Sequence, residues 1–430
     1  MTDRSAAIDL CRFIDASPTP YHAAGEAARR LEAAGFTALD EREVFRVEPG
    51  DRRYVVRGGS TIIAFVAGTD HPARAGFRMI GAHTDSPNFR VKPLGDLARS
   101  GYRQLGVETY GGALYSTWLD RDLSIAGRVS FSRGGGRIES KLVNLARPVA
   151  RIANLAIHLN RGVNKDGLVL NEQKHLPPLL GIGDKVELKS LAAAAVGEDP
   201  KDLLAFDLML YDTMPSALGG LDGELVFASR LDNLGSSHAA TSALIASATR
   251  PRPSTRLIVL YDHEECGSRS AVGAHGTVLR DVVSRVCHGY ASVEPQAMER
   301  AMASSFLVSA DMSHAVHPNY ADSHEPEHKP ELGKGLVIKT NANQSYATNG
   351  ETAARFAWAC RAAGFTPQQF VVRSDLPCGS TIGSITAAML GAQTVDVGGP
   401  MLSMHSCREM AGADDVPLSI AAYMHALESD

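Results

Sequence analysis

Residues 256–265, RLIVLYDHEE, decide the fold, because an unbroken apolar run is followed at once by a histidine and two glutamates. An apolar run without polar alternation predicts a strand of a parallel sheet that is covered on both faces. In such sheets, functional sites form at the C-terminal ends of the strands. We therefore expect an α/β fold in which His263, Glu264 and Glu265 lie at a functional edge.

Other segments of the chain repeat this arrangement. RMIGA (78–82) leads to His83-Thr84-Asp85, and FLVSA (306–310) leads to Asp311. His405 follows the strand-like AQTVDVGG (392–399). Asp232 stands where a loop enters a helix that we predict over 232–249. Helical periodicity also covers 5–35, a hairpin that turns at Gly58-Gly59 is expected over 53–68, and further strands are expected at 335–341 and 369–375.

The middle of the chain differs in character. Residues 95–223 contain glycine and proline pairs and several short β-type runs, which is typical of a mostly β domain. We therefore predict a main domain of residues 1–94 and 224–430, with a mixed sheet flanked by helices. Residues 95–223 would be an inserted β-rich domain that serves oligomerisation.

Composition excludes several classes of function. The 430 residues are 44% hydrophobic and 21% charged with a formal net charge of −5, so no basic excess favours nucleic acid or an anionic membrane surface. No apolar stretch approaches the roughly 18 residues of a membrane span, and the N-terminus lacks the pattern of a secretory signal. The six cysteines form no C-x-x-C pair. A cytoplasmic enzyme is the expectation.

The candidate residues match the chemistry of a metal site. Zinc binds histidine nitrogen and carboxylate oxygen, and a two-metal site needs about five ligand groups, one of which bridges both ions. The candidates supply two histidines, three acidic ligands and a spare glutamate. Because neighbouring side chains of an extended strand point in opposite directions, one of Glu264 and Glu265 could bind metal while the other faces the attacking water. Asp85 could orient His83 as its hydrogen-bond partner.

Seven long motifs then resemble one family. They are GAHTDSPNFRVKP (81–93), SRLDNL (229–234), YDHEECGS (261–268), SADMSHAVHPNY (309–320), KTNANQSYATN (339–349), DLPCGSTIG (375–383) and MHSCREM (404–410). In this order they resemble the aspartyl aminopeptidases, which are two-zinc peptidases with a zinc-peptidase-like catalytic domain and an inserted dimerisation domain. The resemblance spans nearly the whole chain, including PTPYHA (18–23) near its start.

The resemblance implies a role for each motif residue. Asp232 would bridge two Zn²⁺ ions, which Mn²⁺ or Co²⁺ could replace; His83 and Asp311 would complete one site, and Glu265 and His405 the other. Glu264 would be the general base, with Asp85 the partner of His83. Facing the substrate would be His314, Lys339 and, from a neighbouring subunit, His158. In the family a valine is usual where Cys266 stands.

The resemblance also implies the reaction and the assembly. The substrates would be peptides with N-terminal Asp or Glu, and Lys339 would pair with their acidic side chain. Twelve subunits would form a tetrahedral homododecamer.

Alternative interpretations remain open. A related two-zinc exopeptidase or deacylase could prefer neutral substrates, and a non-catalytic assembly protein could keep the fold. Asp232 alone could simply cap a helix. A cysteine hydrolase based on Cys378 is disfavoured, because no single histidine stands out as its base. We expect His317, His324 and His328 to lie in a polar loop.

Overall fold

The computed structural model describes residues 3–185 and 187–429, and they form two compact units. Unit 1 comprises residues up to 85, 216–404 and from 409 onward, and unit 2 comprises 86–215 and 405–408. Each unit has β-sheet structure and buried core residues of its own. The prediction that residues 95–223 serve oligomerisation stays a prediction.

A nine-stranded mixed sheet forms the centre of unit 1. Its order is β1 (Thr37–Ala38), β2 (Arg52–Arg57), β3 (Thr61–Val66), β13 (Thr255–Tyr261), β4 (Phe77–His83), β14 (Phe306–Ala310), β18 (Gln393–Gly398), β16 (Val337–Lys339) and β17 (Gln368–Phe370). The neighbouring strands β13, β4, β14 and β18 run parallel, whereas β3 runs antiparallel to β13 and β16 runs antiparallel to β18. The predicted mixed sheet is therefore confirmed, and its parallel centre contains the strand of the deciding segment.

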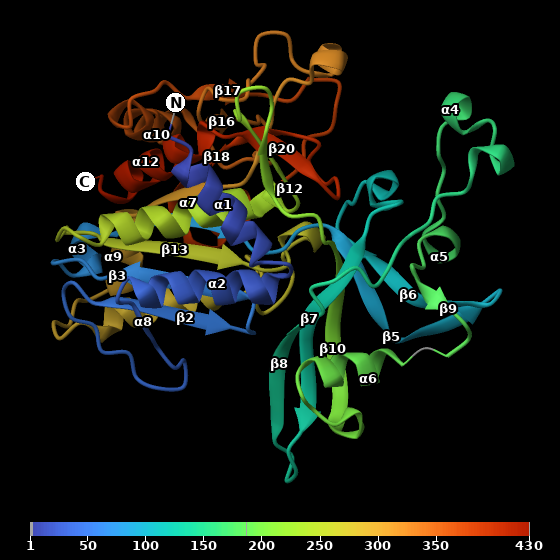
Figure 1. Cartoon of the computed structure of the whole chain (residues 1–430). Coiled ribbons are helices and arrows are strands. Elements are labelled where there is room, and N and C mark those ends of the chain that lie inside the picture. The colour runs from blue at the N-terminus through green and yellow to red at the C-terminus, as the bar shows by residue number, and fades with distance from the viewer. Residues whose placement is uncertain (1–2, 186, 430) are drawn as a thin grey trace. The chain divides into compact units, whose positions relative to one another are not determined.

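Side chains that alternate along these strands feed two cores, one on each face of the sheet. In β13, Ile258 and Leu260 join one core, and Leu257 and Val259 join the other. Helices cover both faces (Figure 1). The helices of the first core are α1 (Ser5–Asp15), α2 (Pro20–Ala33), α7 (Leu231–Ser247), α10 (Gly350–Ala362) and α12 (Asp415–Leu427), and those of the second are α3 (Pro72–Ala75), α8 (Val278–Gly289), α9 (Ala297–Ala303) and α11 (Ile382–Leu390).

The helical stretch predicted over 5–35 is divided into α1 and α2. Proline has no backbone N–H to donate, so it is tolerated in the first turn of a helix but not in its interior. Pro20 accordingly begins α2. The chain leaves α2 at Gly35, whose φ of 83° is the left-handed conformation that glycine adopts without strain. The predicted hairpin is confirmed, since β2 and β3 pair antiparallel across Gly58-Gly59.

A smaller sheet completes unit 1. Its order is β11 (Ala217–Gly219), β12 (Leu225–Ala228), β20 (Glu409–Gly412), β19 (Pro400–Leu402) and β15 (Ser313–His314). The 3-10 turns of this unit are Glu264–Cys266 and Pro318–Ser323. The strands predicted at 335–341 and 369–375 are shorter than expected, because only Val337–Lys339 of the first and Gln369 and Phe370 of the second pair with a neighbour.

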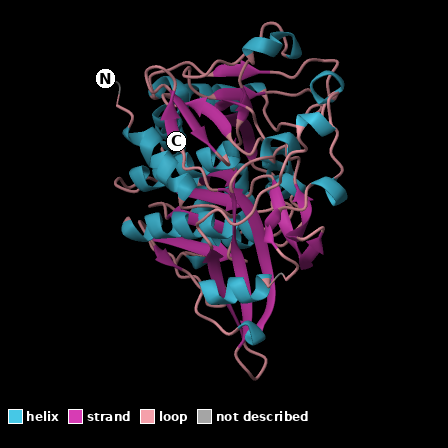
Figure 2. Ribbon diagram, turned by 45° about the vertical axis from the view of Figure 1, so that its right-hand side comes forward, coloured by secondary structure: helices cyan, strands magenta, loops and turns pink. Residues whose placement is uncertain are grey.

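Unit 2 is built on a six-stranded antiparallel sheet. Its order is β8 (Ile138–Asn144), β7 (Leu123–Ser132), β10 (Leu203–Asp212), β5 (Asn88–Arg99), β6 (Tyr102–Tyr110) and β9 (Leu179–Ile182). The helix α6 (Leu188–Ala195) lies against the strands of this sheet (Figures 1 and 2). Its Leu188 and Ala192 side chains belong to the core of the sheet. The remaining short turns are Tyr115–Trp118, Ile157–Leu159, α4 (Val163–Asp166), α5 (Glu172–His175) and Pro200–Asp202.

Among residues 3–185 and 187–429, no helix combines the length and the apolar character that crossing a bilayer requires.

Candidate metal centre

Three adjacent parallel strands of unit 1 carry candidate ligands to one edge of the sheet. His83 is the last residue of β4, Asp311 follows β14, and Glu265 follows β13. Because β13, β4 and β14 are hydrogen-bonded neighbours that run in the same direction, their C-terminal ends lie side by side. The sequence-based expectation that these segments meet is confirmed by the topology.

The side chains at this edge converge on the His83 ring. Its Nε2 atom lies 3.5 Å from Asp232 Oδ1 and 3.4 Å from Asp311 Oδ1. One ligand atom each from His83, Asp232 and Glu265 lies within 4.8 Å of the other two. Four of the five predicted ligands therefore meet in unit 1, although the chain separates them by up to 228 residues.

The orientation of His83 is set by the chain around it. Its Nδ1 atom donates to the backbone carbonyl of Asp85 at 3.0 Å, and because a carbonyl only accepts, this bond places a proton on Nδ1. Nε2 is then the atom that faces Asp232 and Asp311, as metal ligation requires. The backbone carbonyl of His83 also accepts the Ser237 hydroxyl of α7 at 2.7 Å.

Asp85 has a second task that the motif alone did not reveal. Its two carboxylate oxygens accept the backbone N–H groups of Glu264 at 3.1 Å and of Glu265 at 3.0 Å. The buried Asp85 carboxylate therefore joins the end of β4 to the turn after β13. Charge-assisted hydrogen bonds of this kind are about twice as strong as neutral ones.

The expectation that Glu264 and Glu265 alternate along an extended strand is wrong. β13 ends at Tyr261, and His263 adopts φ 64°, which reverses the chain. Glu264–Cys266 then form a 3-10 turn whose N–H groups are held by Asp85. The two glutamates are thus presented by one tight turn, and the hydrogen bonds to Asp85 replace the pairing that a strand would have supplied.

Asp232 lies in the first turn of α7 but departs from helical geometry. Its φ and ψ are −83° and 104°, and the peptide bond to Asn233 is cis. Its backbone N–H donates to the buried Glu409 carboxylate at 3.1 Å, and Asn233 Nδ2 donates to the Ala310 carbonyl at 2.8 Å. Asp232 therefore lies in a kink at the start of α7 and not in its regular helical part.

Burial and neighbouring charges shift the pKa values of the glutamates and of the histidine in this cluster. Burial, added to the repulsion of nearby carboxylates and only partly opposed by His83, raises the pKa of Glu264 to about 8. Burial and the charge of Asp232 raise the pKa of Glu265 well above its ordinary value. Burial alone would lower the pKa of His83, but hydrogen bonds to Asp232, Asp311 and Asp85 raise it well above the usual range.

This donor set fits a divalent cation. Buried carboxylates are costly unless they are paired or coordinate metal. Here His83, Asp232 and Glu265 present one imidazole and two carboxylates to a common point, and the Asp311 carboxylate lies beside the same imidazole. Nitrogen and oxygen donors of this kind suit zinc, manganese or cobalt. The cluster in unit 1 is therefore the candidate metal centre.

Lys339 lies beside this centre at the end of β16 and is buried. Its ammonium donates to the carbonyls of Asp311 at 2.9 Å and of Met312 at 3.3 Å, and to Asp311 Oδ2 at 3.3 Å. It also lies 5.2 Å from the centre of the Tyr346 ring. A substrate that binds Lys339 would therefore compete with three acceptors that already contact its ammonium.

His314, in β15, packs edge-on against Phe370, with 5.8 Å between the ring centres. Phe370 pairs with Lys339 across β17 and β16, so the two predicted substrate residues share a neighbour. Protein atoms crowded around His314, together with the charge of Lys339, lower the pKa of this histidine, although its side chain stays exposed.

The two other predicted histidines belong to unit 2. His405 donates from Nδ1 to the Gly112 carbonyl at 3.1 Å, which gives it the same Nδ1-protonated form as His83. His158 lies exposed in the 3-10 turn Ile157–Leu159. Participation of His405 in the metal centre, and of His158 in the site of a neighbouring subunit, stay predictions.

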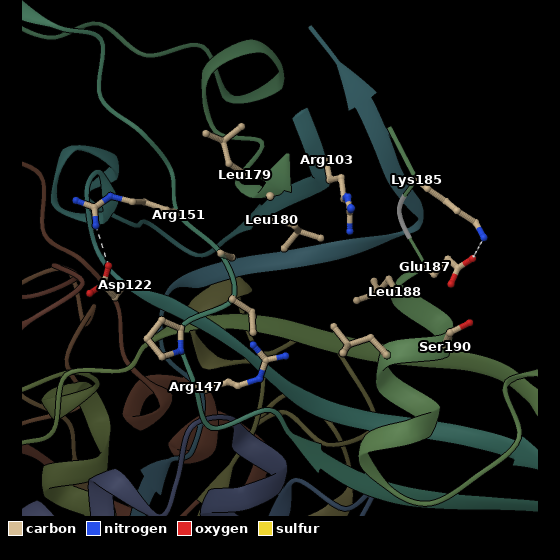
Figure 3. A pocket seen from close by; sticks show the side chains of 15 residues that line it. Arg103, Asp122, Arg147, Arg151, Leu179, Leu180, Lys185, Glu187, Leu188 and Ser190 are labelled. Carbon is tan, nitrogen blue, oxygen red and sulfur yellow. Dashed lines mark hydrogen bonds and ion pairs between the residues drawn. The ribbon is translucent and has the colours of Figure 1, made fainter. Parts of the chain in front are cut away.

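A cleft in unit 2 offers a contrasting kind of pocket. It has a volume of about 780 Å³, and basic and leucine side chains line it (Figure 3). Its acidic side chains Asp122 and Glu187 are paired with Arg151 and Lys185. This cleft lacks the clustered carboxylates and imidazole of the metal centre, so we do not assign it to the same chemistry.

Sequence reasoning gave no role to three buried residues near the centre. Glu409 supports Asp232, Tyr346 covers Lys339, and Asp396 pairs with Lys339 in the register of β18 and β16. Glu409 and Tyr346 lie within quoted motifs, MHSCREM and KTNANQSYATN, which was the available signal. Asp396 lies in a strand whose apolar pattern suggested only a core position.

Comparison with known proteins decides the family. The family model described as aminopeptidase I zinc metalloprotease (M18) matches residues 13–425. The chain belongs to the M18 family of zinc aminopeptidases. The resemblance to the aspartyl aminopeptidases is thus confirmed at the level of the M18 family.

Relatives of this M18 chain match it over nearly its whole length. A probable M18 family aminopeptidase 2 of Pseudomonas fluorescens is 49% identical and covers 95% of this chain and 94% of its own. The structure of the Ape4 and Nbr1 complex has a TM-score of 0.95 at 41% identity, over 99% of this chain and 85% of that one. The S. cerevisiae mApe1 dodecamer has a TM-score of 0.86 at 29% identity, over 98% and 96% of the two chains.

Proposed function

We propose that this M18 aminopeptidase holds two zinc ions per subunit and removes N-terminal Asp or Glu from peptides. The observation that carries the proposal is the buried Lys339 ammonium placed beside the His83, Asp232, Glu265 and Asp311 cluster. A neutral specificity pocket has no use for a buried cation, whereas a substrate carboxylate gains a charge-assisted hydrogen bond from one.

In this proposal, His83 and Asp311 would hold one zinc, Glu265 and His405 would hold the other, and Asp232 would be a ligand of both. When bound, zinc acidifies water and polarises the peptide carbonyl. Positive charge in the cluster lowers the pKa of Glu264 from its metal-free value, which leaves its carboxylate ionised and able to act as a base.

The residues of the chain then carry the proton. The Glu264 carboxylate accepts a proton from the attacking water and passes it to the nitrogen of the leaving amine as the peptide C–N bond breaks. Asp85 keeps Glu264 and Glu265 in their turn during both transfers. In this proposal, His314 donates to the developing oxyanion. The substrate's acidic side chain takes the Lys339 contact that Asp311 Oδ2 occupies at 3.3 Å.

The test is Lys339→Ala, assayed on Asp-, Glu- and Leu-anilides. The loss of a charged hydrogen bond costs about 1.5–3 kcal/mol, so kcat/KM for the acidic anilides should fall about 10- to 100-fold more than that for the Leu anilide. Equal losses on all three would refute the acidic specificity.

One observation favours a second candidate, an M18 aminopeptidase with neutral preference. Lys339 already has three acceptors in its own chain, so it could serve only to hold Asp311. In that case the wild-type protein would hydrolyse the Leu anilide at least as well as the Asp anilide, and Lys339→Ala would reduce both equally.

Two further proposals concern the assembly and the compartment. A homododecamer is supported by the structural similarity to the mApe1 dodecamer of S. cerevisiae. Analytical ultracentrifugation of the purified chain tests it, and a monomer or dimer would contradict it. A reducing, cytoplasmic setting is supported by six cysteines that form no disulfide among the described residues. Fractionation of cells that express the chain tests that proposal.

A further inference from the structure

Asp396 is a fully buried carboxylate that the proposed mechanism does not use. It lies in β18 directly opposite Lys339 of β16 in the antiparallel register. Side chains opposite each other on such a pair share one face of the sheet. The Asp396 side chain therefore lies on the same face of the sheet as the side chain of Lys339.

The carboxylate of Asp396 connects two loops to the sheet. One oxygen accepts the Ala347 backbone N–H at 2.6 Å, and the other accepts the Thr381 hydroxyl at 2.5 Å. The Asp396 backbone N–H donates to the Thr348 hydroxyl at 2.9 Å. Thr381 caps α11, so Asp396 ties both the segment 341–349 and the start of α11 to one strand.

The segment that Asp396 anchors carries Tyr346. The Tyr346 ring lies 5.2 Å from the Lys339 ammonium and packs with Phe370 in a small apolar cluster. A cation near an aromatic face is attracted to it, and more strongly where water is excluded. The position of Ala347 fixes that of Tyr346, and the Tyr346 ring confines the Lys339 ammonium.

We propose that Asp396 is a positioning residue for substrate selection, because it anchors the 341–349 segment and so holds Tyr346 over Lys339, where the acidic side chain of the substrate binds. This inference rests on the proposed acidic specificity. Asp396 acts through Ala347, Thr348 and Tyr346, and it makes no contact with the substrate.

The experiment compares Asp396→Asn with a matched control. Asparagine keeps the size of the side chain but offers one acceptor oxygen instead of two, so the bond from Ala347 or from Thr381 is lost. Asp415→Asn is the control, because Asp415 is also buried and accepts two backbone N–H groups, from Gly333 and Gly335. Both variants are assayed on Asp- and Leu-anilides, and amide exchange is measured for the peptide covering 341–349.

In Asp396→Asn, KM for the Asp anilide should rise about tenfold, kcat should change less than about threefold, and amide exchange in 341–349 should accelerate. KM for the Leu anilide should stay near the wild-type value, and Asp415→Asn should leave both KM values and this exchange unchanged. Thr348→Ala removes the hydroxyl that accepts the Asp396 backbone N–H at 2.9 Å and donates to the Asp396 carbonyl at 3.5 Å. It should shift KM in the same direction by about threefold, and it replaces Asp396→Asn as the test if that variant does not fold.

The outcomes separate the two proposals. Equal rises of KM for both anilides, or unchanged exchange in 341–349, would overturn the positioning role of Asp396. If wild type prefers the Asp anilide and Lys339→Ala abolishes that preference while Asp396→Asn keeps it, only this inference fails. If wild type shows no acidic preference, the acidic specificity fails and the inference fails with it.

Discussion

Asp85→Asn gives the sharpest test of how the metal centre is held together. In the structure the two carboxylate oxygens of Asp85 each accept one backbone N–H, from Glu264 at 3.1 Å and from Glu265 at 3.0 Å. Asparagine keeps one acceptor oxygen and turns an NH₂ group toward the other N–H. The substitution therefore removes one charge-assisted bond at nearly constant volume and leaves two donors facing each other in a buried site.

The magnitude follows from that geometry. A hydrogen bond to a charged group contributes about 1.5–3 kcal/mol, and stranding a buried donor costs a similar amount. A total near 3 kcal/mol corresponds to roughly 100-fold, since about 1.4 kcal/mol is tenfold. The loss should appear as weaker zinc binding and lower kcat/KM, because the turn presents both the ligand Glu265 and the base Glu264. Changes to groups that orient metal ligands typically cost about 10- to 100-fold.

The assay measures zinc affinity by competition with a chelator, together with kcat/KM on the Asp anilide. Asp415→Asn again supplies the matched buried control, since its two backbone N–H bonds lie in another loop. A folded Asp85→Asn protein whose zinc affinity and kcat/KM both stay within about threefold of wild type, well inside the roughly 100-fold expected, would refute the assignment of Asp85 as the residue that fixes the turn.

Three further predictions concern the same unit. Glu264→Gln should keep zinc content and assembly but lose about 10²- to 10⁴-fold in kcat; near wild-type turnover, measured beside metal analysis, would remove Glu264 as the base. In chelator-treated protein the raised pKa values of Glu264 (to about 8) and His83 mean that the folded state binds more protons than the unfolded state, so stability should fall as pH rises from about 4.5 to 8. Thermal unfolding midpoints measured across that pH range check this prediction. Added zinc should reduce the dependence of stability on pH. A rise of stability with pH in the chelator-treated protein would contradict the prediction. Gly383→Ala should destabilise the fold by about 1–3 kcal/mol, because its Cβ would collide with the Asp396 carboxylate; an unchanged unfolding midpoint would show that the carboxylate can move.

The fold and most of the candidate ligands could be predicted because both depend on local pattern. Unbroken apolar runs specify buried strands, and the residue after each run is carried to the same edge when the strands are parallel neighbours. His83 ends β4, and Glu265 and Asp311 follow β13 and β14, which are its neighbours in the sheet. That these three side chains meet could therefore be predicted without knowing any long-range hydrogen bond. Roles beyond that, such as the bridging of two ions by Asp232, came from family resemblance.

Only the tertiary structure decided how these side chains are held. The turn that presents Glu264 and Glu265 exists because Asp85, 179 and 180 residues away in the chain, accepts their N–H groups. Lys339 meets Asp311 and Tyr346, and Asp396 ties down the segment beside them, through bonds between distant residues. Apolar periodicity reports whether a residue is buried, but the partner of a buried polar group depends on which elements pack together, and that pairing is absent from any local stretch of sequence.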